Sequence, residues 1–172
     1  MDDIQIELIQ PGQVDEVIEL FTHHVYEGNR DEAVTHLAGH REGEADTFVA
    51  YVGRNLAGFL TVRWHSNYPG FRDQNIPLIH QIEVFTPFHR HGVASQLMER
   101  AERLIATRSR QAGICVGLFD AYGPAQRLYA KRGYVPDGQG ACQDHRPLKY
   151  GETVTITHDL LIWMTKELPS PL

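Results

Sequence analysis

A strand pattern that runs directly into a helix pattern constrains the fold of this chain more than any other feature. Apolar residues at Ile79, Ile82, Val84 and Phe85 indicate a strand that ends at Pro87. Beyond it, apolar residues recur at helical spacing, with charged residues between them, at Val93, Ala94, Leu97, Met98, Ala101, Leu104 and Ile105. These patterns predict a strand that leads through a short junction into an amphipathic helix.

The rest of the chain mixes strand and helix patterns in the same way. We predict a strand at residues 4–8, helices carrying Val14 to Phe21 and near residues 32–40, and a hairpin, TFVAYVGRNLAGFLTVRW, that turns around residues 53–55. We further predict a strand at 114–119, a helix from Gly123-Pro124 to Gly133, a strand from Tyr134 that turns at 136–138, and a final strand at 154–164. This order predicts an α/β fold with a central mixed, mostly antiparallel twisted sheet flanked by helices.

Length, composition and charge exclude several classes of protein. The 172 residues are 42% hydrophobic and 22% charged and contain no linker-like tract, so we expect one domain over residues 1–172. A formal net charge of -6 without a run of Lys and Arg disfavours nucleic-acid binding. The sequence shows no signal-peptide pattern and no apolar run near the roughly 20 residues of a membrane helix, so we expect neither. Two cysteines without a disulfide framework favour the reducing cytoplasm.

The junction FHRHGVAS, residues 88–95, gathers basic side chains at the start of the helix. The first N–H groups of a helix lack helical acceptors and lie at the positive end of its dipole, so this end can hold an anion. Gly92 lets the backbone approach a bound group and Ala94 keeps the next position small. Polar side chains could add to this site from His89, Arg90, His91 and Ser95. Basic residues beside a glycine at a helix start are also common without any ligand, so the junction needs corroboration.

Corroboration comes from a second motif. "HRHGVASQLMERAE", followed after one strand by "YGPAQRLYAKRGYVPDG", resembles the GNAT superfamily of acetyl-CoA-dependent N-acetyltransferases. Gly92-Val93-Ala94 fits the family's Q/R-x-x-G-x-G/A loop. The family's later helix pattern is fitted by Ala125, Leu128, Tyr129, Gly133 and Tyr134. Two positions depart from the family pattern: His89 stands where Gln or Arg is usual, with Arg90 one place along, and Tyr122 stands where Asn is frequent.

The resemblance implies where acetyl-CoA would bind. The pyrophosphate would be held by main-chain N–H groups of Arg90, His91, Gly92, Val93, Ala94 and Ser95, beside His89. The pantetheine arm would pair like an extra strand with the backbone near Val84 and Phe85, and would pass Tyr122. No pattern of His, Cys and carboxylates completes a metal site, so we expect no metal.

The same resemblance implies an acyltransferase that moves acetyl from acetyl-CoA to a primary amine of a small molecule or peptide. Tyr129 is the candidate general acid for the departing thiolate, because a phenol stays protonated at neutral pH. Glu83 is the candidate base, directly or through water. A buried packing role for Tyr129 and an exposed position for Glu83 are the structural alternatives, and the sequence leaves open which strand face Glu83 occupies.

Three matters stay open at the level of sequence. One is whether the protein instead holds acyl-CoA without turnover, as a sensor or interaction module. Another is whether the loop WHSNYPGFRDQNIP borders the acceptor pocket or a dimer contact, or is simply a packed surface loop. The third is whether the protein is a homodimer, since the apolar final strand, TITHDLLIWM, could pair with a partner's edge.

Overall fold

The computed structural model of the chain describes residues 3–24, 34 and 44–169. The chain divides into two compact units, Met1–Trp64 with Ile79–Leu104, and His65–Leu78 with Ile105–Leu172. Each unit contains a hydrophobic cluster of its own and is described by itself. The prediction of one domain over residues 1–172 stays a prediction. The helix predicted near residues 32–40 lies outside the described residues, apart from Val34.

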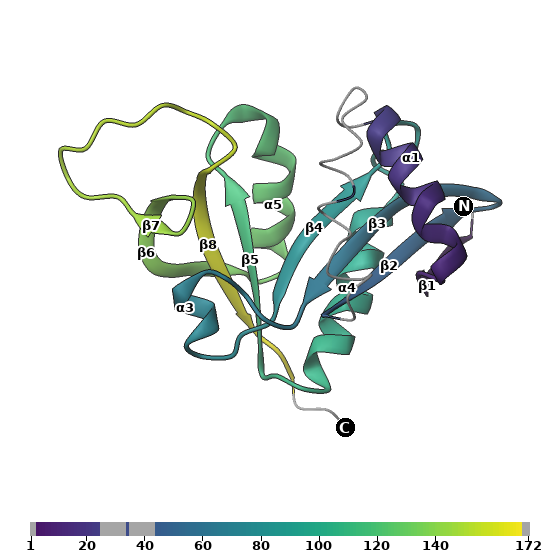
Figure 1. Cartoon of the computed structure of the whole chain (residues 1–172), viewed down its shortest axis with the longest axis horizontal. Coiled ribbons are helices and arrows are strands. Elements are labelled where there is room, and N and C mark those ends of the chain that lie inside the picture. Colours follow the sequence, from purple (N-terminus) through teal and green to yellow (C-terminus); the bar gives the residue numbers. More distant parts are fainter. Residues whose placement is uncertain (1–2, 25–33, 35–43, 170–172) are drawn as a thin grey trace. The chain divides into compact units, whose positions relative to one another are not determined.

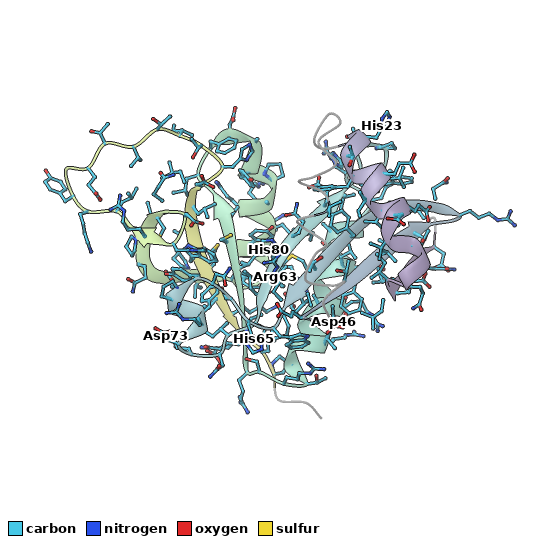
Figure 2. All side chains as sticks on the ribbon, in the orientation of Figure 1. His23, Asp46, Arg63, His65, Asp73 and His80 are labelled. Carbon is cyan, nitrogen blue, oxygen red and sulfur yellow. The ribbon has the colours of Figure 1, made fainter. Side chains whose placement is uncertain are left out.

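Four neighbouring strands form the sheet of the first unit, in the order β1-β2-β3-β4 (Figure 1). They are β1 (Ile4–Leu8), β2 (Ala45–Val52), β3 (Asn55–Arg63) and β4 (Leu78–Val84). β1 pairs antiparallel with β2, and β2 pairs antiparallel with β3. The predicted hairpin is confirmed, with Val52 opposite Asn55 and Gly53 at φ 61 in the turn. At the other end of the hairpin lie the labelled residues Asp46 and Arg63 (Figure 2), and Asp46 accepts a 2.7 Å hydrogen bond from the Trp64 indole.

Helices cover both faces of this sheet (Figure 1). α1 (Val14–His24), preceded by the 3₁₀ turn η1 (Pro11–Gln13), clusters with Val49 of β2 and Phe59 of β3. Neighbouring Phe48 carries Arg100 of α4 (Val93–Ala106) over its ring, 5.9 Å from the centroid. Adjacent residues of a strand point to opposite faces, so α1 and α4 lie on opposite sides of β2. This explains why β2 and β3 are buried along most of their length.

The two helices follow the predicted apolar periodicity. On α1, the Phe21 ring is fully buried and meets Phe59 edge-on, with ring centroids 5.2 Å apart. On α4, the periodic residues Val93, Leu97, Met98, Ala101 and Ile105 are buried. Both helices are therefore confirmed, and each is held by burying one apolar stripe.

β4 approaches β3 closely because β3 carries a glycine at the contact. A Cβ built on Gly58 would lie 2.3 Å from the Glu83 carbonyl oxygen and 3.0 Å from the Val84 Cα. The ladder continues one residue past β4, where Phe85 N–H donates to the Ala57 carbonyl at 2.8 Å. β4 ends at Val84, so Phe85, which we predicted within the strand, lies one residue beyond it.

We expect Gly58→Ala to destabilise the protein strongly. The added methyl group would overlap backbone atoms of β4, which cannot rotate away, and such overpacking costs about 1–3 kcal/mol. Gly12→Ala is the matched control because a Cβ there meets nothing within 4 Å. Urea unfolding of the two variants measures the difference. Equal free energies of unfolding for both variants would contradict this account of the β3–β4 contact.

The second unit has a sheet in the order β5-β8-β6-β7. Its strands are β5 (Gln111–Gly117), β6 (Val135–Gln143), β7 (Arg146–Pro147) and β8 (Leu160–Glu167). All of its pairings are antiparallel, with Cys115 opposite Trp163 and Cys142 opposite Leu161. α5 (Gly123–Lys131) is the predicted helix after β5.

Three sequence predictions in this unit were wrong in their bounds. β5 spans Gln111–Gly117 rather than 114–119. The predicted turn at 136–138 is a register shift inside β6, between Pro136 and Ala141. The final strand begins at Leu160, not Val154, because residues 153–156 join no ladder and a bend and a turn at residues 157–159 precede β8. β7 was not predicted, since two residues are too short to show alternation.

An aromatic cluster packs against this second sheet. The segment of residues 65–75 contains a short helix, α3 (Pro69–Arg72), which was not predicted. The Tyr68 ring stacks on Trp163 with centroids 4.1 Å apart, and Phe71 meets both rings edge-on. The Tyr68 hydroxyl donates to Asp137 at 2.6 Å, and burial raises the Tyr68 pKa. The aromatic residues of this segment thus serve packing.

No helix in the described ranges is both long and apolar enough to cross a membrane. Within the same residues, no group of three or more His, Cys, Asp and Glu side chains is placed to hold a metal ion.

Candidate active site

The junction between β4 and α4 turns through two residues with positive φ. After β4 the chain forms the 3₁₀ turn η2 (Thr86–Phe88), and then Arg90 has φ 67 and Gly92 has φ 87. The first bond of the helix runs from Gln96 N–H to the Gly92 carbonyl at 3.1 Å. The N–H groups of residues 93–95 have no acceptor within the helix. They therefore point outward from the helix start, at the positive end of its dipole.

The space in front of this helix start is open. A Cβ on Gly92 would meet no atom within 4 Å, and Arg90, His91 and Gly92 are exposed. Gly92 is therefore required by its φ rather than by crowding. A non-glycine residue with φ above zero, such as Arg90, is uncommon, and such residues cluster at ligand sites. The loop can therefore present backbone donors and a fixed guanidinium charge to an anion.

His89 makes a contact that sequence reasoning did not anticipate. Its Nε2 lies 2.7 Å from the Val84 carbonyl oxygen, so the ring links the turn to the end of β4. The Phe85 carbonyl accepts from Phe88 N–H at 2.8 Å. A cofactor arm that paired with this backbone would hydrogen-bond to the same two carbonyl oxygens. Each oxygen can accept a second hydrogen bond, because it has a second lone pair. The predicted cofactor contacts of His89, Val84 and Phe85 stay predictions.

Glu83 lies on the same face of the sheet as α1. Phe85, two residues further along, packs in the cluster formed with α1, and residues two apart in an extended chain share a face. This answers the question of orientation that the sequence left open. Glu83 is half-buried, and burial raises the pKa of its carboxyl from an ordinary value near 4.5 to about 7. A group with that pKa can accept and release a proton near neutral pH.

Tyr129 occupies the last turn of α5, where the helix closes around Gly133. Tyr134 N–H donates to the Tyr129 carbonyl at 3.0 Å, and Gly133 N–H donates to the Ala130 carbonyl at 3.1 Å. With Gly133 at φ 90, these two bonds form a Schellman motif, as the predicted C-terminal glycine requires. The Tyr129 side chain is buried, and its ring centroid lies 6.2 Å from that of Tyr134. The L-Y-x-x-x-G-Y pattern therefore has a structural role, whatever the Tyr129 hydroxyl does.

Tyr122, the N-cap of α5, sits in a small aromatic cluster of the same unit. Its hydroxyl lies 3.1 Å from His158 Nδ1, and its ring meets Phe119 edge-on at 4.9 Å. The Gln126 amide donates to the Gly117 carbonyl at 2.7 Å and ties α5 to the end of β5. The contact with His158 was not predicted, because the two residues lie 36 positions apart in the chain.

The predicted site residues thus fall into two groups. The first unit contains Glu83, Val84, Phe85 and the loop of residues 89–95. The second contains Tyr122 and Tyr129. The structure joins the members of the first group through consecutive backbone of β4, η2 and α4, and those of the second through α5.

Comparison with known proteins identifies the family of this chain. The sequence of residues 43–136 matches the Acetyltransferase (GNAT) domain family. The chain belongs to the GNAT acetyltransferase family. All of the predicted site residues of this GNAT protein lie inside the matched segment. No functionally curated protein matches the chain.

Solved structures share the fold of this GNAT protein over almost its whole length. Aminoglycoside 6'-acetyltransferase type Ii is 17% identical, with 97% of this chain and 99% of that chain covered and a TM-score of 0.70. Ard1 from Thermoplasma volcanium is also 17% identical, with coverage of 97% and 99% and a TM-score of 0.68. The PaiA N-acetyltransferase from Thermoplasma acidophilum, solved in complex with coenzyme A, is 11% identical, with coverage of 96% and 99% and a TM-score of 0.63. The predicted α/β fold, with a mixed, mostly antiparallel sheet flanked by helices, is confirmed. Family membership supports acetyltransferase activity with acetyl-CoA as cosubstrate.

Proposed function

We propose that this protein transfers an acetyl group from acetyl-CoA to a primary amine of a small molecule or a peptide. The observation that carries the proposal is the β4–α4 loop, where Gly92 at φ 87 leaves open space before a helix start inside the segment that matches the family. Diphosphate oxygens need several donors at one place, and consecutive backbone N–H groups at a helix start supply them. Arg90 would add a permanent positive charge.

The proposed chemistry is direct attack of the amine on the thioester. The amine nitrogen forms a bond to the acetyl carbonyl carbon, and the bond from that carbon to sulfur breaks. Glu83, directly or through water, would take the proton that the amine must lose. Tyr129 would give its phenolic proton to the departing thiolate. The raised pKa of Glu83, about 7, supports the first of these roles.

Charge and cysteine chemistry support two further parts of the proposal. The formal net charge of -6 favours the approach of a cationic amine over an anionic acceptor. Cys115 and Cys142 are both free thiols, which suits a reducing compartment such as the cytoplasm.

The proposal is tested by release of free CoA thiol from acetyl-CoA in the presence of polyamines, amino acids, aminoglycosides and peptides with free N-termini. We expect release with at least one amine class, and weaker CoA binding in Gly92→Ala. An L-residue at positive φ costs about 1–2 kcal/mol and moves the loop off its present path. Gly138→Ala is the matched control, because Gly138 has φ 92 and the same open space. Calorimetry with CoA should show weaker binding only for Gly92→Ala.

The rival function, a protein that holds acyl-CoA without turnover, makes a different prediction. It expects CoA binding with the same dependence on Gly92 and no thiol release with any amine. Absence of CoA binding in the unmodified protein would contradict both functions.

A further inference from the structure

β1 lies at the outer edge of the sheet of the first unit, and half of its backbone groups point away from that sheet. The strand order begins with β1, and β2 is its one partner among the described residues. Ile9 N–H donates to the Thr47 carbonyl at 2.8 Å, and every second residue back along β1 bonds to β2 in the same way. The N–H and C=O groups of Ile4, Ile6 and Leu8 therefore face outward.

The chain itself closes only one end of this edge. The Gln10 side-chain amide donates to the Leu8 carbonyl at 3.1 Å. Within the described ranges, the outward N–H and C=O groups of Ile4 and Ile6 form no hydrogen bond. Native proteins often protect an exposed edge with Lys, Pro or a bulge. β1 reads Ile-Gln-Ile-Glu-Leu and pairs with β2 without a bulge, so its edge can still accept another strand.

A groove runs beside this edge, between β1 and α4. It has a volume of about 350 Å³ and is lined by Ile4, Ile6, Gln96, Glu99, Arg100 and Arg103. The four residues from α4 are spaced three and four apart, so they form one stripe of the helix. Leu8, which is 42% exposed, continues the apolar row of β1, because alternate residues of a strand share a face. A strand added to β1 would place every second side chain in this groove.

The groove has an unbalanced positive charge. Its two arginines and one glutamate leave a charge of +1, in a chain whose formal net charge is -6. Arg103 forms an ion pair with Glu99. Arg100 instead lies over the Phe48 ring, 5.9 Å from the centroid, and has no carboxylate partner among the described residues. The groove therefore favours an acidic side chain next to an apolar one.

We infer that the β1 edge binds an extended acidic segment of a partner protein as an added antiparallel strand. The backbone groups of Ile4 and Ile6 form the main-chain hydrogen bonds, and the groove selects the side chains. An apolar residue of the segment contacts the two isoleucines, and a carboxylate beside it pairs with Arg100.

A second copy of this chain fits the same edge less well. In an antiparallel pair of two β1 strands, the same face of both strands lies on the same side of the sheet. The second copy would therefore place its own Ile4, Ile6 and Leu8 in the groove. These side chains offer Arg100 no carboxylate, so the charge of the groove favours the acidic segment.

Fluorescence anisotropy with a labelled peptide tests the inference. The probe is Thr-Glu-Thr-Val-Thr-Glu-Thr with blocked ends, in which the glutamates and the valine share one face of a strand. We expect saturable binding to the whole protein, and binding at least about five-fold weaker when lysine replaces both glutamates. N-methylation of the valine removes an N–H that faces β1 and should abolish binding. N-methylation of the next threonine, whose N–H faces solvent, is the control and should preserve it.

Amide hydrogen exchange locates the bound peptide on β1. The N–H groups of Ile4 and Ile6 should exchange more slowly once the peptide is present, whereas Glu7 N–H, which faces β2, should be slow without it. Arg100→Glu should weaken binding about ten-fold. Arg127→Glu makes the same change of charge at an exposed residue of α5 and should bind like the unmodified protein. Both variants should keep the thermal midpoint, because both side chains are exposed.

Several results would overturn the inference. The peptide could fail to bind, the lysine peptide could bind equally well, or the protection could fall outside β1. Light scattering that shows a dimer, with slow exchange at Ile4 and Ile6 before peptide is added, would assign the edge to a second copy instead. None of these measurements uses acetyl-CoA, so their outcome is independent of the proposed acetyl transfer.

Discussion

Replacing Tyr129 by phenylalanine is expected to slow acetyl transfer by about 10²- to 10⁴-fold, the usual contribution of a general acid. The substitution removes only the hydroxyl. The buried ring, its contact with Tyr134 and the backbone bonds around Gly133 all remain. The fold should therefore persist, with a change of about 0.5–1.5 kcal/mol at most for a lost hydrogen bond. The measurement is the rate of CoA thiol release at saturating acetyl-CoA.

Tyr134→Phe is the matched control for this prediction. Tyr134 is the buried neighbour of Tyr129 and would likewise lose only its hydroxyl. If Tyr129 is the acid, Tyr134→Phe should leave the rate close to that of the unmodified protein. Turnover by Tyr129→Phe within a few-fold of the unmodified protein would remove Tyr129 from the acid role and leave it a packing residue of the Schellman motif.

Replacing Glu83 by glutamine is expected to lower the rate by a similar factor, about 10²- to 10⁴-fold, and to change its pH dependence. In the unmodified protein the rate should rise with pH through about 7, as the buried carboxyl loses its proton and becomes a base. Glutamine cannot accept that proton, so the rise should disappear. Glu19→Gln, at an exposed residue of α1, should keep it. A rise near pH 7 that survives in Glu83→Gln would assign the base to another group.

Stability gives an independent measure of the same carboxyl. The folded pKa, about 7, lies above the ordinary value near 4.5, so the unfolded chain gives up this proton at a lower pH than the folded protein does. The group therefore costs no stability below about pH 4.5, and the cost grows as the pH rises to about 7. We expect Glu83→Gln to melt at a higher temperature than the unmodified protein at pH 8, and at a similar temperature at pH 4.5. An equal difference in melting temperature between the two proteins at pH 8 and at pH 4.5 would contradict a buried Glu83 that titrates between these pH values.

Local sequence was enough for the elements that depend on neighbouring residues. The apolar stripe of α4, the turn at Gly53 and the closure of α5 at Gly133 were all predicted, because each follows from residues within a few positions of one another. The β4–α4 loop was found for the same reason. Elements with little periodicity were missed, among them α3 with four residues and β7 with two.

The chemistry of the site depended on contacts that sequence does not contain. Whether Glu83 faces α1 is decided by the packing of Phe85, and the rise of its pKa is decided by burial. The contacts of His89 with the Val84 carbonyl and of Tyr122 with His158 form only when the chain folds, so the sequence alone does not reveal them. Residues 154–159 show the opposite case, since their β-branched sequence predicts a strand and yet they join no ladder among the residues that the structure describes.

By itself the sequence determined most of the strands and helices in their order, the glycine turn at the start of α4 and the family to which these motifs belong. These features are local, because a backbone conformation or an apolar stripe is set by adjacent residues. Only the tertiary structure decided which face carries Glu83, how far its carboxyl is desolvated and where the final strand begins. Burial and pairing depend on what the rest of the chain places beside a residue, and that is fixed only when the whole chain has packed.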